Sequence, residues 1–268
     1  MIHYDIDGEA GPWLIFVHGL TCDGRDWRHQ VSALAGGHRC LSVDLRGHGR
    51  SAHIDGPYDM ETLAGDVAAL MHGLAIGDAV LIGHSMGTRV ITALALQVPE
   101  RVRALVFVDG SQQGRGDPLQ SRQDALAVLG EGPQQQTFTK RMFEAMFTQR
   151  CEDADRRAIT DRARAMPAPV FRELFGNMSA WDAGRMEFAL SQIRQPVTVL
   201  QSTRVTPARE RFSLRADERT PYLDMLRARV TNVSIEVIPE VGHFTQLEAA
   251  APVSRIIAAV AADPPGGF

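Results

Sequence analysis

The chain has 268 residues, 44% of them hydrophobic, which is enough to bury one large core in a single domain that carries an insertion. Its net charge of −4 gives no reason to expect nucleic acid or an anionic membrane as a partner, and no apolar run approaches the roughly 18 residues that span a bilayer. The three cysteines lack metal-ligand spacing and no apolar leader is visible at the start, so we expect a cytoplasmic protein.

Short apolar segments alternate along the chain with longer segments of helical periodicity. This alternation is typical of an α/β fold with a mostly parallel sheet and helices between its strands. The expected strands are Ile2–Ile6, Trp13–Val17, Cys40–Val43, Ala79–Ile82, Ala104–Val108, Val197–Leu200 and Ser234–Ile238. The expected helices are Trp27–Ala35, Met60–Leu74, Gly87–Gln97 and Pro252–Ala262.

The alternation stops between residues 112 and 195, where helical patterns occur without a convincing strand. We therefore expect residues 1–111 and 196–268 to form the core domain and residues 112–195 to form a helical cap. The cap is rich in apolar side chains, which either line a pocket or pack the cap onto the core. These residues are Phe138, Met142, Phe143, Met146, Phe147, Met166, Phe171, Phe175, Met178, Trp181, Met186 and Phe188.

The segment from Ala79 to Arg89 reads AVLIGHSMGTR, a strand-forming run followed by G-x-S-x-G and then by a helical pattern. This placement is typical of a nucleophile elbow, a tight turn that lifts a serine hydroxyl above the edge of a sheet. The residues two before and two after the serine must be small, and Gly83 and Gly87 occupy those positions. Ser85 is therefore the candidate nucleophile, and an ordinary tight turn is the alternative.

A serine hydroxyl needs a base to become nucleophilic at neutral pH, and His243 is the candidate. It lies in the sequence VGHF, directly after the last expected strand and before a helical segment. Open α/β sheets place their chemistry at such strand ends. The other histidines lack a comparable setting, and His18, His48 and His84 lie in tight glycine motifs with structural roles.

Four motifs together make the chain resemble an α/β-hydrolase of the esterase, lipase and C–C-bond hydrolase type. They are Phe16–Leu20 (FVHGL), Asp44–Ser51 (DLRGHGRS), Gly83–Gly87 and Val241–Phe244, in the order typical of that family. The resemblance implies a mostly parallel sheet of the eight-stranded type, flanked by helices and carrying the cap insertion. It also implies an oxyanion hole made by the backbone N–H groups of Leu20 and Met86.

The acid of the expected triad departs from the family's common pattern. Most relatives carry it just beyond the penultimate strand, but residues 202–207 contain no carboxylate. A second location known in the family, directly after the strand next to the nucleophile's strand, is occupied here by Asp109. We therefore expect Asp109 to be the acid, with Glu210 as the next candidate and a Ser–His pair without an acid as the third.

These residues predict a serine hydrolase, in the first place a carboxylesterase, that cleaves a small or medium apolar ester, thioester, lactone or activated C–C bond. No metal or organic cofactor is implied, because the motifs that hold one are absent from the sequence. The alternatives are a cofactor-independent ring-cleaving dioxygenase, which the position of Asp109 favours, and a non-catalytic ligand receptor. The expected partner is a small apolar or aromatic molecule, and the chain is expected to be a monomer or a homodimer.

Overall fold

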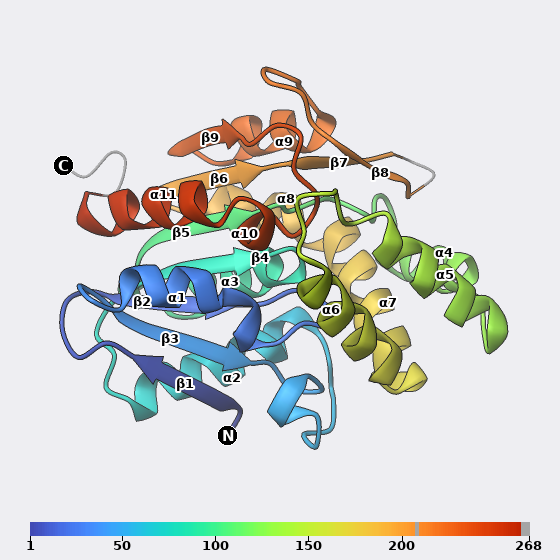
Figure 1. The fold of residues 1–268 in the computed structure, drawn as a ribbon. Helices are drawn as coiled ribbons and strands as arrows, with labels where there is room; N and C mark the ends of the chain where they lie inside the picture. Colours follow the sequence, from blue (N-terminus) through green and yellow to red (C-terminus); the bar gives the residue numbers. More distant parts are fainter. Residues whose placement is uncertain (207–208, 264–268) are drawn as a thin grey trace.

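The computed structural model describes residues 1–206 and 209–263. Its main sheet has seven strands in the order β1-β3-β2-β4-β5-β6-β9, in which only β1 runs antiparallel to its neighbour (Figure 1). The strands are β1 (His3–Asp7), β2 (Trp13–Val17), β3 (Arg39–Asp44), β4 (Ala79–His84), β5 (Val102–Val108), β6 (Val197–Gln201) and β9 (Val233–Val237). The seven expected strands are thus confirmed to within one or two residues.

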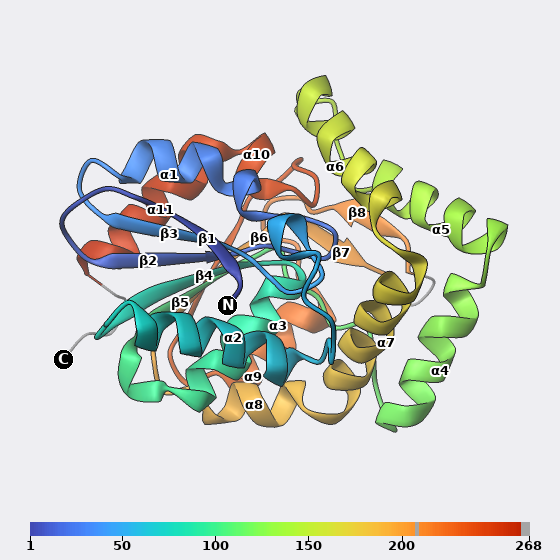
Figure 2. The same cartoon turned by 90° about the horizontal axis from the view of Figure 1, so that it is seen from below.

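Helices cover both faces of this sheet, as Figure 2 shows with the sheet seen along its edge. One face carries α1 (Arg28–Leu34), α10 (Thr245–Glu248) and α11 (Ala250–Ala262). The other face carries α2 (Met60–Gly73), α3 (Met86–Gln97), α8 (Met186–Gln192) and α9 (Pro221–Arg229). The structure therefore has the three-layer α/β architecture that the alternating pattern predicts.

The two faces of the sheet form separate apolar cores, and strand β2 shows why. Its residues are buried on both faces, as expected for a central parallel strand. Leu14 and Phe16 pack in the core beneath α1 and α11, whereas Ile15 and Val17 pack in the core beneath α2 and α3. This alternation follows from the two-residue period of a strand, and it holds the sheet rigidly between the helical layers.

Four helices between β5 and β6 lie beyond the carboxyl ends of the strands, on the right in both views (Figures 1 and 2). They are α4 (Pro118–Leu129), α5 (Pro133–Glu144), α6 (Asp153–Ala165) and α7 (Ala168–Gly184). The fifth helix of this stretch, α8, returns to the sheet and packs against α3. Helices α4–α7 therefore cover the edge at which parallel strands present their functional loops.

Three features differ from the sequence-based expectations. The main sheet has seven strands among the described residues rather than eight, and two short strands pair only with each other. These are β7 (Thr203–Val205) and β8 (Arg211–Ser213). They were not predicted, because each has only three residues, mostly polar, and so shows no alternation of apolar and polar residues. Helix α9 was also missed, although Thr220 caps it by accepting from the Leu223 N–H. None of the described helices has both the length and the apolarity required to cross a membrane.

Candidate active site

Ser85 lies in the sharp turn between β4 and α3. Its φ of 52° and ψ of −111° are unfavourable for a residue with a side chain, and its N–H donates to the Val108 carbonyl at 3.0 Å. A Cβ on Gly83 would lie 2.5 Å from the Gly87 carbonyl oxygen, and one on Gly87 would lie 2.4 Å from the Val17 oxygen. Only glycine fits at these two positions, so the neighbouring packing holds Ser85 in its strained conformation.

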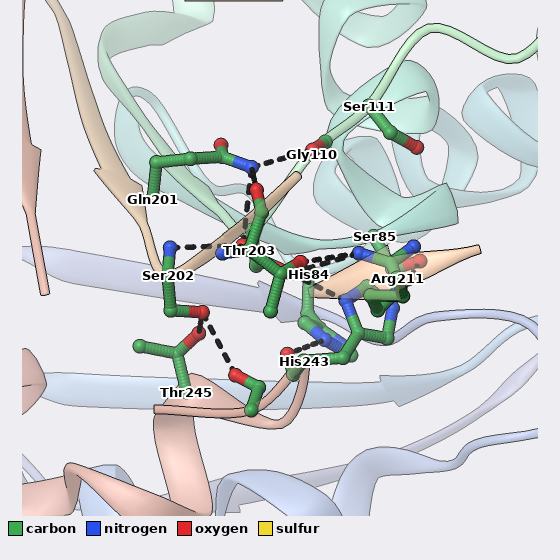
Figure 3. Close-up of polar contacts among 12 residues, drawn as sticks. His84, Ser85, Gly110, Ser111, Gln201, Ser202, Thr203, Arg211, His243 and Thr245 are labelled. Atoms are coloured by element: carbon green, nitrogen blue, oxygen red, sulfur yellow. Dashed lines mark hydrogen bonds and ion pairs between the residues drawn. The ribbon is translucent and has the colours of Figure 1, made fainter. Parts of the chain in front are cut away.

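A continuous line of hydrogen bonds runs from Ser85 through His243 to Asp109. Figure 3 labels Ser85 and His243. The Ser85 Oγ lies 2.9 Å from His243 Nε2, and His243 Nδ1 lies 2.6 Å from Asp109 Oδ2. The carboxylate can only accept, so Nδ1 carries the proton and Nε2 accepts from the serine hydroxyl. The imidazole is therefore held in the tautomer that can remove a proton from Ser85.

Asp109 lies directly after β5 with a φ of 45°, and its carboxylate is fully buried. Oδ1 accepts from the backbone N–H groups of Ser202 at 2.9 Å and Thr203 at 2.7 Å, and from Gln201 Nε2 at 3.1 Å. Oδ2 accepts from the Thr203 hydroxyl at 2.5 Å in addition to His243. The residues after β6 thus supply donors that fix the carboxylate, although they contain no acid themselves.

Glu210, the second candidate for the acid, lies elsewhere. Its side chain is exposed, and its backbone carbonyl accepts from the Thr206 N–H at 2.9 Å. The carboxylate that the structure brings to His243 is that of Asp109. Glu210 therefore does not take the position that this alternative required, because the short β7–β8 hairpin carries it out toward solvent.

A buried arginine adjoins the same carboxylate. Arg211 Nη1 lies 3.1 Å from Asp109 Oδ2 and 2.5 Å from the Thr203 hydroxyl oxygen, and its side chain is 7% exposed. The guanidinium thus shares one carboxylate oxygen with His243. Sequence analysis missed Arg211, because no local pattern indicates that it contacts Asp109, which lies 102 positions earlier in the chain.

The electrostatics keep His243 neutral and Asp109 charged. Burial lowers the pKa of His243 to about 4, the charge of Arg211 acts in the same direction, and Asp109 opposes both. Burial alone would raise the pKa of Asp109, but its hydrogen bond to His243 and the charge of Arg211 hold that pKa below its usual value. At neutral pH the imidazole is therefore free to accept a proton.

The loop that carries His243 is anchored on both sides. His84 Nε2 donates to the His243 carbonyl at 2.9 Å, and the Ser202 hydroxyl donates to the Gly242 carbonyl at 2.8 Å. The His243 N–H donates to the Met146 carbonyl at 2.7 Å, which ties the loop to the segment after α5. His84 thus has the structural role expected from its glycine motif, and it positions the candidate base.

The loop after β2 brings Leu20 close to Ser85. A Cβ on Gly19 would lie 3.1 Å from the Ser85 Cβ, so the two turns are in contact. His18 holds this loop, since its Nδ1 lies 2.7 Å from the Gly19 oxygen and its Nε2 accepts from the Leu45 N–H at 3.0 Å. Within residues 1–206 and 209–263, neither the Leu20 nor the Met86 N–H is used in a loop or side-chain hydrogen bond.

Apolar side chains of the helical insertion close over Ser85. The free space in this pocket is only about 20 Å³, bounded by the elbow, the His243 loop, Gln113 and Arg211. Its apolar wall from the insertion consists of Met142, Phe143, Met146, Phe175 and Met178. By contrast, Phe188 is 57% exposed, and the Trp181 indole donates to Glu61 at 3.0 Å. Part of the apolar set named from the sequence therefore faces Ser85, and part serves packing or lies at the surface.

The described part of the chain contains no group of three or more His, Cys, Asp or Glu side chains arranged to hold a metal ion. Cys22, Cys40 and Cys151 are buried and free. Burial raises the pKa of Cys40 and of Cys151 to about 12, with nearby carboxylates acting in the same direction. These two thiols remain protonated at neutral pH, so they do not compete with Ser85 as candidate nucleophiles.

The family described as "alpha/beta hydrolase fold" matches residues 12–250 of the chain. Among curated proteins, a 2-(acetamidomethylene)succinate hydrolase from Mesorhizobium japonicum is 30% identical over 161 residues, which is 60% of this chain and 56% of that protein. The dihydrolipoyllysine-residue acetyltransferase component of an acetoin cleaving system from Pseudomonas putida is 28% identical over 94% of this chain and 64% of that protein. The chain thus spans less than two thirds of the length of these two relatives.

Among solved structures, an enol-lactonase from Burkholderia xenovorans superimposes with a TM-score of 0.76 and 25% sequence identity. The match covers 98% of this chain and 96% of that chain, so it includes the helical insertion as well as the sheet. The likeness therefore extends over the whole architecture that surrounds Ser85.

Proposed function

Because the chain belongs to the α/β-hydrolase family, we propose that it is a serine hydrolase that cleaves carboxylic esters through an acyl-enzyme on Ser85. The observation that carries this proposal is the hydrogen-bonded line from Ser85 Oγ through His243 to a buried Asp109. A thioester, a lactone or an activated C–C bond would be attacked in the same way. The names of the hydrolase and enol-lactonase relatives support a hydrolytic reaction.

In the first half-reaction, Ser85 Oγ attacks the ester carbonyl carbon while His243 Nε2 takes the hydroxyl proton. Asp109 keeps the proton on Nδ1 and stabilises the imidazolium that forms. The carbonyl oxygen becomes an anion, which the N–H groups of Leu20 and Met86 stabilise. The tetrahedral intermediate then collapses: the bond from carbon to the alcohol oxygen breaks, and His243 gives its proton to that oxygen.

In the second half-reaction, a water molecule attacks the acyl group on Ser85. His243 takes a proton from the water, and the same two backbone N–H groups stabilise the second oxyanion. When this intermediate collapses, Ser85 Oγ leaves with the proton from His243 and the carboxylic acid is released. Every proton transfer in the cycle passes through His243. Ester hydrolysis involves no net electron transfer, so the cycle as written needs no redox partner.

The methionine and phenylalanine wall over Ser85 supports an apolar acyl group of small or medium size. We assign this wall to a cap formed by residues 112–195, with residues 1–111 and 196–268 as the catalytic core. The cap must move for a substrate to enter, since about 20 Å³ does not accommodate an acyl chain. We retain the carboxylesterase activity and the monomeric or homodimeric state as parts of this proposal.

Stopped-flow kinetics with p-nitrophenyl butyrate test the acyl-enzyme. We expect a burst of about one nitrophenolate per active site, followed by slower turnover, and no burst from Ser85→Ala. Ser42→Ala is the control, because Ser42 is a buried serine within β3 whose hydroxyl has no hydrogen-bond partner among the described residues. Loss of the burst in both variants, or its survival in Ser85→Ala, would overturn the assignment of Ser85.

A cofactor-independent dioxygenase is the second candidate, favoured by the position of Asp109 directly after β5. In that reaction His243 deprotonates a heteroaromatic substrate, and oxygen reacts with the resulting anion. Oxygen consumption with a hydroxyquinolone, in the absence of ester turnover, would support it. Stoichiometric binding of a ligand with neither reaction would instead support a receptor.

A further inference from the structure

A second cavity of about 510 Å³ lies beside the candidate acid. It is bounded by the loop after β5, the β7–β8 hairpin and the start of α9. Figure 3 shows four of its lining residues, Gly110, Ser111, Gln201 and Thr203, around the hydrogen bonds of the candidate site. The lining includes the arginines Arg115, Arg204, Arg209 and Arg219, and no aspartate or glutamate is among the described lining residues.

Two of these four arginines are neutralised by neighbouring carboxylates. Arg204 pairs with Glu218 at 2.8 Å, and Arg219 pairs with Asp224 at 2.8 Å. Their charges are therefore already balanced, and exposed ion pairs of this kind contribute little to binding. A ligand that enters the cavity would find these two guanidinium groups occupied.

The other two arginines have no carboxylate partner among the described residues. Arg115 makes no ion pair, and Arg209 Nη1 donates only to the neutral amide oxygen of Gln113, at 3.2 Å. Asp182, which acts electrostatically on Arg209, already accepts two hydrogen bonds of 2.7 Å from Arg89. A partly buried guanidinium without an anionic partner is costly, and a bound anion removes that cost.

This cavity and the pocket at Ser85 are neighbours. Gln113 lines both spaces. The Arg209 guanidinium lies 5.4 Å from the centre of the Phe175 ring, and Phe175 lines the pocket at Ser85. Arg209 and Gln113, which are joined by a hydrogen bond, therefore form part of the partition between the two spaces.

We propose that the arginine-lined cavity binds a carboxylate group of the substrate, so that the preferred ester carries an acid at the end of its acyl chain. This inference rests on the proposed serine hydrolase. A carboxylate is a stronger acceptor than an amide oxygen, so it replaces Gln113 as the partner of Arg209. The freed Gln113 side chain then moves out of the partition, and the cavity joins the pocket at Ser85.

The test compares two p-nitrophenyl esters with acyl chains of the same length, the hexanoate and the half-ester of adipic acid. We expect the wild type to favour the adipate half-ester by about tenfold or more in kcat/KM. Arg209→Gln should lose that preference because the KM of the adipate half-ester rises, whereas Arg209→Lys should retain part of it. Arg103→Gln, which removes the same charge at the opposite end of the sheet, should behave as the wild type.

Isothermal titration of the unmodified protein with adipate separates this inference from the proposed function. We expect saturable binding that weakens about tenfold in Arg209→Gln. An equal preference for both esters in the wild type, or an equal loss for both in Arg209→Gln, would overturn the inference while the hydrolase stands. If neither ester is hydrolysed, the proposed function fails, and the titration alone decides whether the cavity binds carboxylates.

Discussion

Asp44 and Asp109 occupy matching places in the fold, at the carboxyl ends of β3 and β5, and both are buried. Asp44 accepts from the N–H groups of Gly24 at 2.8 Å and Arg50 at 2.9 Å, and from Arg50 Nε at 2.9 Å. Asp109 likewise accepts from two backbone N–H groups and one guanidinium. Burial alone would raise the pKa of Asp44, but these hydrogen bonds lower it to about 2.

The difference between them is the neighbouring loop. Asp44 faces the short helical turns Gly24–Trp27 and Gly49–Ser51, so it braces two loops. Asp109 faces the end of β6 and the loop after β9, which brings His243 to its second oxygen. A buried carboxylate at a strand end therefore stabilises loops or is a candidate catalytic acid, and the side chains that the adjacent strands place beside it decide which.

The largest expected effect comes from exchanging each carboxylate for an amide. Asp109→Asn should lower kcat by about 10⁴, because the amide no longer stabilises the imidazolium or fixes its tautomer. Asp44→Asn should retain most of the activity but lose about 1–3 kcal/mol of unfolding free energy, because buried donors lose a charged acceptor. Ester hydrolysis and urea unfolding measure the two effects. An equal loss of kcat in both variants would show that Asp109, like Asp44, has only a structural role.

An intermediate effect is expected from two glycines that face these regions. Gly19→Ala places a methyl group 3.0 Å from His84 Nδ1 and 3.1 Å from Ser85 Cβ, which pushes the Leu20 N–H away from the elbow. We expect kcat to fall by up to about 10²-fold, since one oxyanion donor is worth roughly that much.

Gly24→Ala is the matched control, because its methyl group would lie 3.2 Å from Asp44 Oδ1. It should change stability and leave kcat close to that of the wild type. Steady-state ester kinetics beside thermal unfolding distinguish the two outcomes. A fall in kcat of the same size for both glycines would contradict the assignment of the Leu20 N–H to the oxyanion hole.

The smallest expected effect at neutral pH concerns the two arginines that contact these carboxylates. Wild-type kcat/KM should fall as the pH drops through about 4, because protonated His243 cannot take the Ser85 proton. Arg211→Met removes a charge that lowers the pKa of His243, so the pKa rises toward its ordinary 6.5 and activity is lost at a higher pH.

Arg50→Met provides the comparison, since Arg50 also donates to a buried carboxylate at a strand end, that of Asp44. Its acid limb should coincide with that of the wild type. The pH dependence of kcat/KM for p-nitrophenyl butyrate measures both variants. An unchanged acid limb in Arg211→Met would show that Arg211 has a purely structural role.

Much of the fold follows from local patterns. The strand Trp13–Val17 was predicted with its observed bounds, because its apolar run and flanking breaks are contained in a few residues. The turn at Ser85 is also marked locally, since Gly83 and Gly87 flank the serine at the two positions that must be small. The short strands β7 and β8 could not be predicted in this way, because they exist only by pairing with each other.

The three-layer fold and the candidates Ser85 and His243 could be predicted from the sequence, because strand periodicity and turn chemistry depend on neighbouring residues, and the family resemblance added Asp109. The folded structure was needed to show that Asp109, rather than Glu210, contacts His243, which lies 134 positions later in the chain. It also decided that Arg211 shares that carboxylate and that Arg209 borders a second cavity. Parallel strands align their carboxyl ends at one edge, so loops far apart in sequence meet there, and no local pattern records which side chains they bring together.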